Sequence, residues 1–230
     1  MPYPTIHTEA LLKFIQILDS SFPSGTFTHS FGLEPHAVLG IVKNAKDLKR
    51  FLENIIMYQY AKMEFPTVAK VYKYAKSSSL SLLLKLDIQF SSMYCHAFAK
   101  AYKTIGENCF SHLKDLKLNK DITKLYFESI KADKTPCSEI VLLSVFAYDL
   151  DMCKEDFMLF WSKKNLINIA AASLKISKIK PSEAQQILFL MDDFLREHTK
   201  NIDANPSNFN PFFDSIIYMH KNIEPRLFMT

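Results

Sequence analysis

The sequence is poor in glycine and has no evident cysteine pairs. Its 230 residues include only 4 Gly and 4 Cys. So few glycines argue against a β-sandwich or barrel, which needs many tight turns. Cys95, Cys109, Cys137 and Cys153 lie far apart and follow no secretory leader. We therefore expect a reduced compartment without disulfides.

Long apolar runs and charge clusters are also missing. The uncharged runs fall well short of the roughly 18 apolar residues that a membrane span needs, so we expect a cytoplasmic protein that does not enter membranes. The formal net charge of +4 is spread along the chain. A dispersed charge of this size gives no reason to expect nucleic-acid binding.

Nucleotide and metal motifs are absent as well. The chain lacks the glycine-rich phosphate loop of GTPases, so it is not expected to be a GTPase itself. Cys95-His96 and the pair Cys109 and His112 supply only two ligands each, whereas a zinc site needs three or four. His29 and His36 can approach each other, but no third ligand is evident. We therefore expect no cofactor, no metal site and no catalytic residue.

Helical periodicity dominates what is present. Apolar residues recur at three- and four-residue spacing along most of the chain, which predicts amphipathic helices. The apolar run 140–143 can form a buried strand, but no second run is available to pair with it, so a helix is favoured. The expected helices span 9–20, 44–63 with Asn44 as N-cap, a further one from Pro66, 80–113 with a break near Ser91-Ser92, 121–131, 138–150, 156–174, 182–199 and 211–223.

These helices predict an all-α fold. We expect one domain, 1–230, built as a bundle of roughly eight to ten helices with a flexible C-terminal tail. Gly106 lies inside a predicted helix, where it indicates close contact with a neighbouring helix and not a stop. Residues 116–120 are expected to be a linker.

The densest local pattern runs from Asp19 to Glu34 and is called the 19–34 segment below. It joins the first helix to the rest of the chain through serines, threonines, phenylalanines and two glycines. Hydroxyl groups in such a connection can bond backbone groups, while Phe22, Phe27 and Phe31 anchor it to the core. An ordered connector is the simpler interpretation.

A hydrolase is an alternative interpretation of the same segment. Asp19, Ser21 and His29 are the residue types of a nucleophilic triad, but within one short segment they lack separate elements to hold base and nucleophile in register. No G-x-S-x-G elbow supports this alternative. A metal-binding carrier using His and Cys residues is a second alternative.

The chain's last residues are unusual for a terminus. Leu227, Phe228 and Met229 follow Arg226, and no residues remain to fold over them. Such an apolar end either packs back on its own domain or docks into a partner. Because residues 224–230 follow the last predicted helix, we expect them to contribute little to the core and to form a partner-docking tail.

Together the two segments resemble those of the UreF family. The matching residues of the 19–34 segment are Phe22, Pro23, Gly25, Phe27, His29, Ser30, Gly32, Leu33 and Glu34, and those of the tail run from Arg226 through Leu227, Phe228 and Met229 to Thr230. Two family motifs are absent, since 96–99 and 178–181 carry other residues. The resemblance implies an all-helical, cytoplasmic homodimer that is not an enzyme.

The resemblance also implies a set of partners. The family binds a second accessory protein, UreD, called UreH in some bacteria, and through that complex recruits the GTPase UreG to insert nickel into the urease apoprotein. Regulation of the GTPase is implied in the same way. On this interpretation the 19–34 segment, Phe27 above all, borders the surface on which the tail with Arg226 is ordered.

Overall fold

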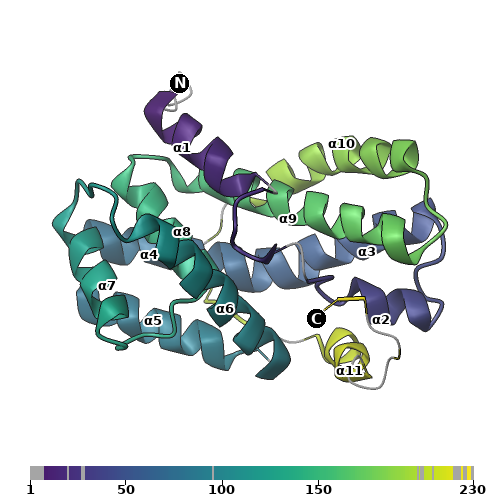
Figure 1. Ribbon diagram of the computed structural model, residues 1–230, viewed down its shortest axis with the longest axis horizontal. Helices are drawn as coiled ribbons and strands as arrows, with labels where there is room; N and C mark the ends of the chain where they lie inside the picture. The colour runs from purple at the N-terminus through teal and green to yellow at the C-terminus, as the bar shows by residue number, and fades with distance from the viewer. Residues whose placement is uncertain are drawn as a thin grey trace.

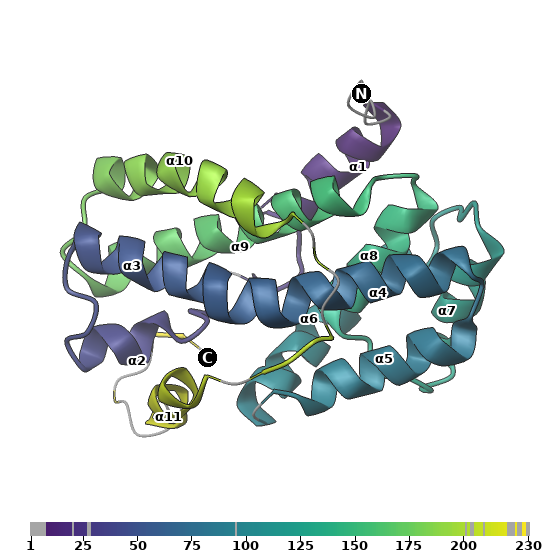
Figure 2. The same ribbon diagram turned by 180° about the vertical axis from the view of Figure 1, so that it is seen from behind.

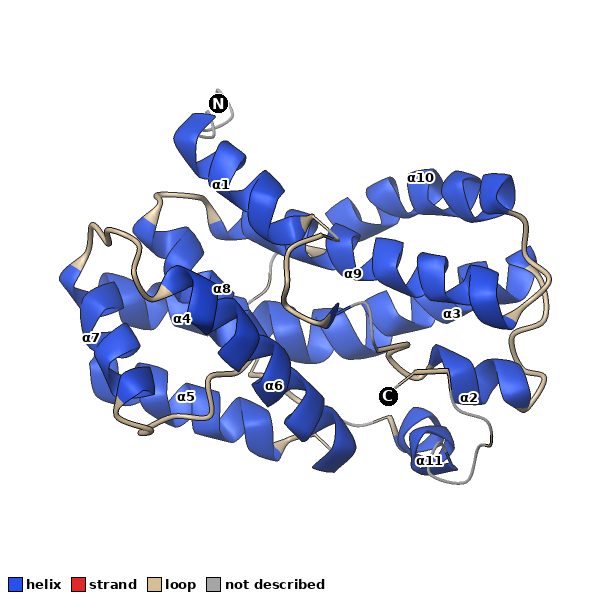
Figure 3. Ribbon diagram, viewed as in Figure 1, coloured by secondary structure: helices blue, strands red, loops and turns tan. Residues whose placement is uncertain are grey.

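Helices make up every regular element that the structure describes. The computed structural model describes residues 8–19, 21–26, 29–94, 96–200, 202, 205–208, 210–219, 224 and 227–228. Strands are absent from these residues (Figure 3), so the all-α prediction is confirmed. The helices are α1 (Thr8–Leu18), α2 (Leu33–Val38), α3 (Ala45–Ile55), η2 (Ile56–Glu64, π-helical), α4 (Phe65–Lys76), α5 (Leu80–Ser92), α6 (His96–Leu113), α7 (Asp121–Lys131), α8 (Glu139–Asp149), α9 (Lys154–Ile176), α10 (Pro181–His198) and α11 (Pro211–Met219).

The longest element joins α3, η2 and α4 into one rod. It begins as predicted at Asn44, whose side-chain oxygen accepts the Asp47 N–H at 3.1 Å. The predicted end near Met63 and the predicted start at Pro66 match the change from η2 to α4 between Glu64 and Phe65, but the backbone stays helical across this change, which was not predicted. Pro66 has no N–H to give the carbonyl of Lys62, four residues earlier, and the Ser207 N–H bonds that carbonyl instead at 2.9 Å.

The rod runs along the molecule and divides the other helices into two groups (Figures 1 and 2). On one half, α10 packs beside α3, and α9 packs on α10 and reaches both α3 and α4. On the other half, α5, α6, α7 and α8 gather around α4. Nearly every residue of α8 is buried, so the apolar run 140–143 is the all-round apolar face of an interior helix and not a strand.

Gly106 lies where α6 packs tightly against the start of α8. A Cβ atom on Gly106 of α6 would lie 1.7 Å from the carbonyl oxygen of Cys137, just before α8. The predicted close contact is thus confirmed. Buried Asp87 of α5 holds the same connection, because its carboxylate accepts the N–H groups of Cys137 and Ser138 at 3.2 and 3.1 Å.

The remaining helices follow the predicted order with small shifts at their ends. The break near Ser91-Ser92 separates α5 from α6, and α7 spans the predicted residues. The six-residue helix α2 was not predicted. No helix in the described part of the chain has the length and apolarity needed to cross a bilayer.

Candidate functional site

The 19–34 segment begins where α1 ends, and its first half packs on α6. Phe22 is 9% exposed, and its ring lies 5.5 Å from that of His112. The Asp19 carboxylate accepts the Ser21 N–H at 2.7 Å, while Pro23 is exposed. Phe22 therefore anchors the segment against α6, as the sequence predicted, and Pro23 faces solvent.

Gly25 forms the turn that follows. Its φ is +82°, a conformation that favours glycine, and a Cβ atom there would lie 3.3 Å from the Asn108 side-chain nitrogen. Asn108 of α6 donates to the Ser24 carbonyl at 3.1 Å. The buried hydroxyls of Ser24 and Thr26 pair at 2.7 Å. This half of the segment is thus an ordered connector, held by hydroxyl and amide groups.

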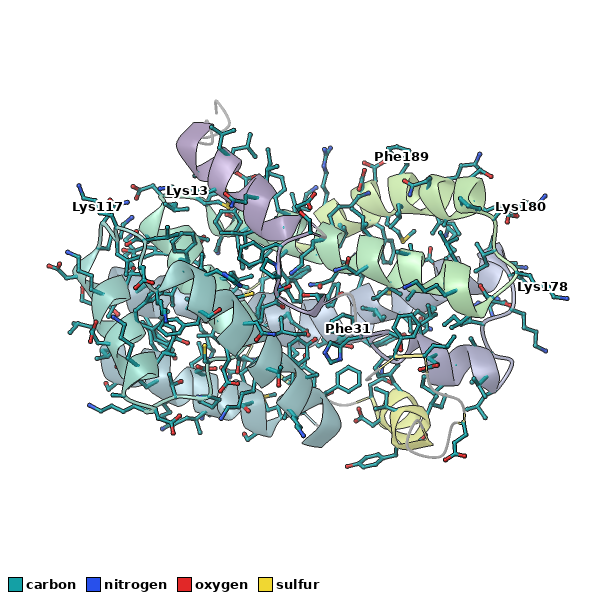
Figure 4. All side chains as sticks on the ribbon, viewed as in Figure 1. Lys13, Phe31, Lys117, Lys178, Lys180 and Phe189 are labelled. Carbon is teal, nitrogen blue, oxygen red and sulfur yellow. The ribbon has the colours of Figure 1, made fainter. Side chains whose placement is uncertain are left out.

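His29 and Phe31 enter the interior. His29 is 5% exposed and its ring lies 6.0 Å from that of Phe31. Phe31 continues to Tyr102 of α6 at 6.2 Å, and Figure 4 places Phe31 near the middle of the molecule. Burial lowers the pKa of His29 to about 4, against the opposing charge of Glu139. His29 is consequently a neutral, buried imidazole near pH 7.

The second half of the segment turns into α2. The Ser30 hydroxyl accepts the Glu34 N–H at 3.2 Å, which satisfies a free donor at the start of the helix. Gly32 has a φ of +83°, and a Cβ atom there would lie 3.0 Å from Phe213 and 3.3 Å from Ile217 of α11. Gly32 thus allows α11 to pack directly on the backbone.

The chain's end meets this half of the segment. The Glu34 carboxylate is buried and accepts the Leu227 N–H at 2.7 Å and the Phe228 N–H at 3.3 Å. Figure 1 shows this end segment, in yellow, beside α2. Two regions that are 193 residues apart in sequence therefore form one site.

The expectation that residues after Pro225 contribute little to the core is wrong at Phe228. This side chain is 7% exposed and belongs to the hydrophobic core, and the Lys175 ammonium lies 5.6 Å from its ring centre. Leu227, in contrast, is 60% exposed. The two apolar neighbours thus face opposite ways.

The predicted partner-binding residues lie in different surroundings. Phe22 and Gly25 pack on α6, His29 and Ser30 are buried within the segment, and Gly32 lies under α11. Glu34, Leu227 and Phe228 meet directly. Phe27, Arg226 and Met229 lie outside the described residues.

Buried charged groups are the features that sequence reasoning missed. Glu139 of α8 and Lys164 of α9 form an ion pair at 2.9 Å with side chains 1% and 3% exposed. Trp161 donates to the same carboxylate at 3.3 Å. The sequence signal was the spacing of Trp161 and Lys164, which puts an indole N–H and an ammonium on one helix face.

The metal and thiol candidates do not converge among the described residues. These residues contain no group of three or more His, Cys, Asp or Glu side chains able to hold a metal ion. Cys109 is a buried free thiol whose pKa burial raises to about 12, whereas His112 is exposed. Cys95 lies outside the described residues. Cys109 therefore resembles a packed apolar side chain more than a ligand.

A cavity lies next to the site. It has a volume of about 270 Å³ and opens between α2, the rod and α11. His36, Arg50, Phe51 and Phe213 are among its lining residues. His36 stands between the rings of Phe51 and Phe213, at 4.9 and 5.3 Å. These aromatic contacts hold α2 against the rod and α11.

Fold and site together define a class: an all-helical protein in which a polar and aromatic connector meets the chain's end at Glu34. The model of the UreF family matches residues 42–192, more than half of the chain. The chain therefore belongs to the UreF family.

Individual relatives extend the similarity. "Urease accessory protein UreF" of Bacillus sp. (strain TB-90) is 25% identical over 225 residues, covering 96% of this chain and 99% of the relative. The protein of the same name from Lachnoclostridium phytofermentans is 22% identical over 191 residues, 81% and 82% of the two chains. The family model does not reach the 19–34 segment or the tail, while the Bacillus alignment spans nearly the whole chain.

Proposed function

We propose that this chain is a non-catalytic urease accessory protein that binds UreD (UreH) and, through that complex, recruits the GTPase UreG. The complex then inserts nickel into the urease apoprotein, and the chain regulates GTP hydrolysis by UreG. It acts in the cytoplasm as a homodimer. Its membership of the UreF family and its similarity to urease accessory proteins support this proposal.

One structural observation carries the proposal. The two segments that resemble those of the UreF family lie far apart in sequence, yet the Glu34 carboxylate bonds the backbone at Leu227 and Phe228. A surface built from both segments suits protein docking, because its polar groups bond its own backbone and leave an apolar side chain outside. No chemistry is required of it.

Removal of residues 224–230 tests the docking role. We expect binding to purified UreD (UreH) to weaken by about thirtyfold or more, the cost of losing a central interface anchor. The loss of buried Phe228 should also lower the melting temperature. Binding is measured by calorimetry at a temperature where circular dichroism shows that the truncated chain remains helical. A truncated, folded chain that binds with wild-type affinity would refute the docking role.

The metal-carrier and hydrolase alternatives make different predictions. A carrier retains stoichiometric nickel after purification with a mild chelator, and a hydrolase loses turnover on replacement of His29. If the proposed function holds, the purified chain retains no stoichiometric nickel, shows no turnover and still captures UreD (UreH). Tight stoichiometric nickel would instead favour the carrier.

A further inference from the structure

The Glu34 carboxylate acts as a clamp on the chain's end. The side chain lies at the start of α2 and is 2% exposed. One of its oxygens accepts the Leu227 N–H and the other accepts the Phe228 N–H. Both bonds go to consecutive backbone groups, so they fix the path of the chain at Leu227 and Phe228.

A clamp on the backbone fixes which side chain faces inward. At the observed position Phe228 is 7% exposed and Leu227 is 60% exposed. A shift of one residue would replace the inward ring with a different side chain and would lose the packing of Phe228 in the core. The inward position of Phe228 and the outward position of Leu227 therefore depend on Glu34.

On the docking role proposed above, we propose that Glu34 is a positioning residue that holds the tail in register, so that Leu227 is the side chain offered to an apolar pocket on the UreD-type partner. Phe228 is the internal anchor and does not contact the partner. Glu34 thus affects partner binding by positioning Leu227, without contacting the partner itself.

Leu190 of α10 is a matched control for Leu227. The two leucines are 61% and 60% exposed, and only Leu227 adjoins the clamp. In the full chain, Leu227→Asn should weaken binding to purified UreD (UreH) by about tenfold or more with an unchanged melting temperature. Leu190→Asn should leave both unchanged. Wild-type affinity for the Leu227→Asn protein would overturn the proposal.

Glu34→Gln tests the clamp itself, with Glu53→Gln as control. Glu53 of α3 is partly buried and paired with Lys49, far from the tail in sequence. The amide that replaces the Glu34 carboxylate keeps its shape but exchanges one acceptor for a donor. We expect hydrogen exchange at the Leu227 and Phe228 amides to accelerate by about tenfold or more and partner affinity to fall, whereas Glu53→Gln changes neither.

The outcomes separate this inference from the proposed function. Loss of binding on truncation together with wild-type binding by Leu227→Asn would overturn the inference alone. Wild-type binding by the truncated chain would overturn both. Unchanged exchange at the two amides in Glu34→Gln would show that the carboxylate does not position the tail. If Glu34→Gln fails to fold, the Leu227→Asn comparison still decides which side chain meets the partner.

Discussion

At the scale of single residues, three glycines have the same backbone conformation in different surroundings. Gly25, Gly32 and Gly40 have φ values of +82°, +83° and +71°. A Cβ atom on Gly32 would meet packed Phe213 and Ile217, whereas one on Gly40 would meet only the flexible end of Lys43. Adding a side chain at Gly32 or at Gly40 therefore costs backbone strain at either position. Only at Gly32 does it also cause a clash with packed side chains.

Gly32→Ala should reduce the free energy of unfolding more than Gly40→Ala does. Backbone strain costs each variant about 1–2 kcal/mol, and the crowding against α11 costs the Gly32 variant about 1–2 kcal/mol more. Urea unfolding followed by circular dichroism measures both losses. Equal losses would mean that α11 moves aside without cost.

At the scale of elements, the sequence predicted most helices because their signals are local. Asn44 caps its helix through its own side chain, and the apolar spacing of α7 repeats within eleven residues. The continuity of the rod was not predictable, because the bond that satisfies Lys62 beside Pro66 comes from Ser207, far along the chain. Helix α2 was missed because its six residues are too few to establish a period, and Leu33, Glu34, Pro35 and His36 are buried regardless of polarity.

At Gly106, helix propensity and packing predict opposite changes in the free energy of unfolding when the residue is replaced by alanine. In a helix interior, Gly→Ala normally stabilises by about 1 kcal/mol. At Gly106 the new methyl group would overlap the Cys137 carbonyl, so α6 must move away from the start of α8. We expect Gly106→Ala to lower the free energy of unfolding by about 2 kcal/mol or more. Thermal unfolding decides the sign, and any stabilisation would contradict the close packing.

At the scale of the whole molecule, the site was only partly predictable. The sequence indicated both segments, but Leu227 and Phe228 are both apolar, and nothing local determines which one faces the core. Both of their backbone N–H groups bond Glu34, which lies near the other end of the chain. Sequence periodicity describes a face of one helix, and it cannot describe a surface assembled from two distant segments.

Buried His29 makes global stability depend on pH. Its pKa is about 4 in the folded chain and 6.5 in the unfolded chain, so between these values protons bind mainly to the unfolded state. The stability that neutral His29 contributes is complete above pH 6.5 and is lost as the pH falls from 6.5 towards 4, by about 3 kcal/mol at most. Denaturation of the wild type and of His29→Asn across this range measures the difference.

The comparison with His29→Asn is needed because other buried groups oppose this trend. Burial raises the pKa of Glu64 and of Asp87, so protonation of these carboxyls favours the folded state as the pH falls. Both groups are common to the two proteins, and their contribution cancels in the difference. Parallel pH profiles for wild type and variant would contradict a buried, neutral His29.

The segment 205–208 has a mechanical consequence. It crosses the rod, where the Ser207 N–H bonds the Lys62 carbonyl at 2.9 Å and the Lys70 ammonium bonds Asn205 at 2.6 Å. The Asn208 amide bonds the Met93 carbonyl at the end of α5 at 2.7 Å. Tension applied by a partner to the chain's end is thus resisted first at Glu34 and then at these ties. A pull on Leu227 therefore loads Glu34 and the buried ring of Phe228 first, and the bonds of 205–208 to the rod resist it before it reaches α10.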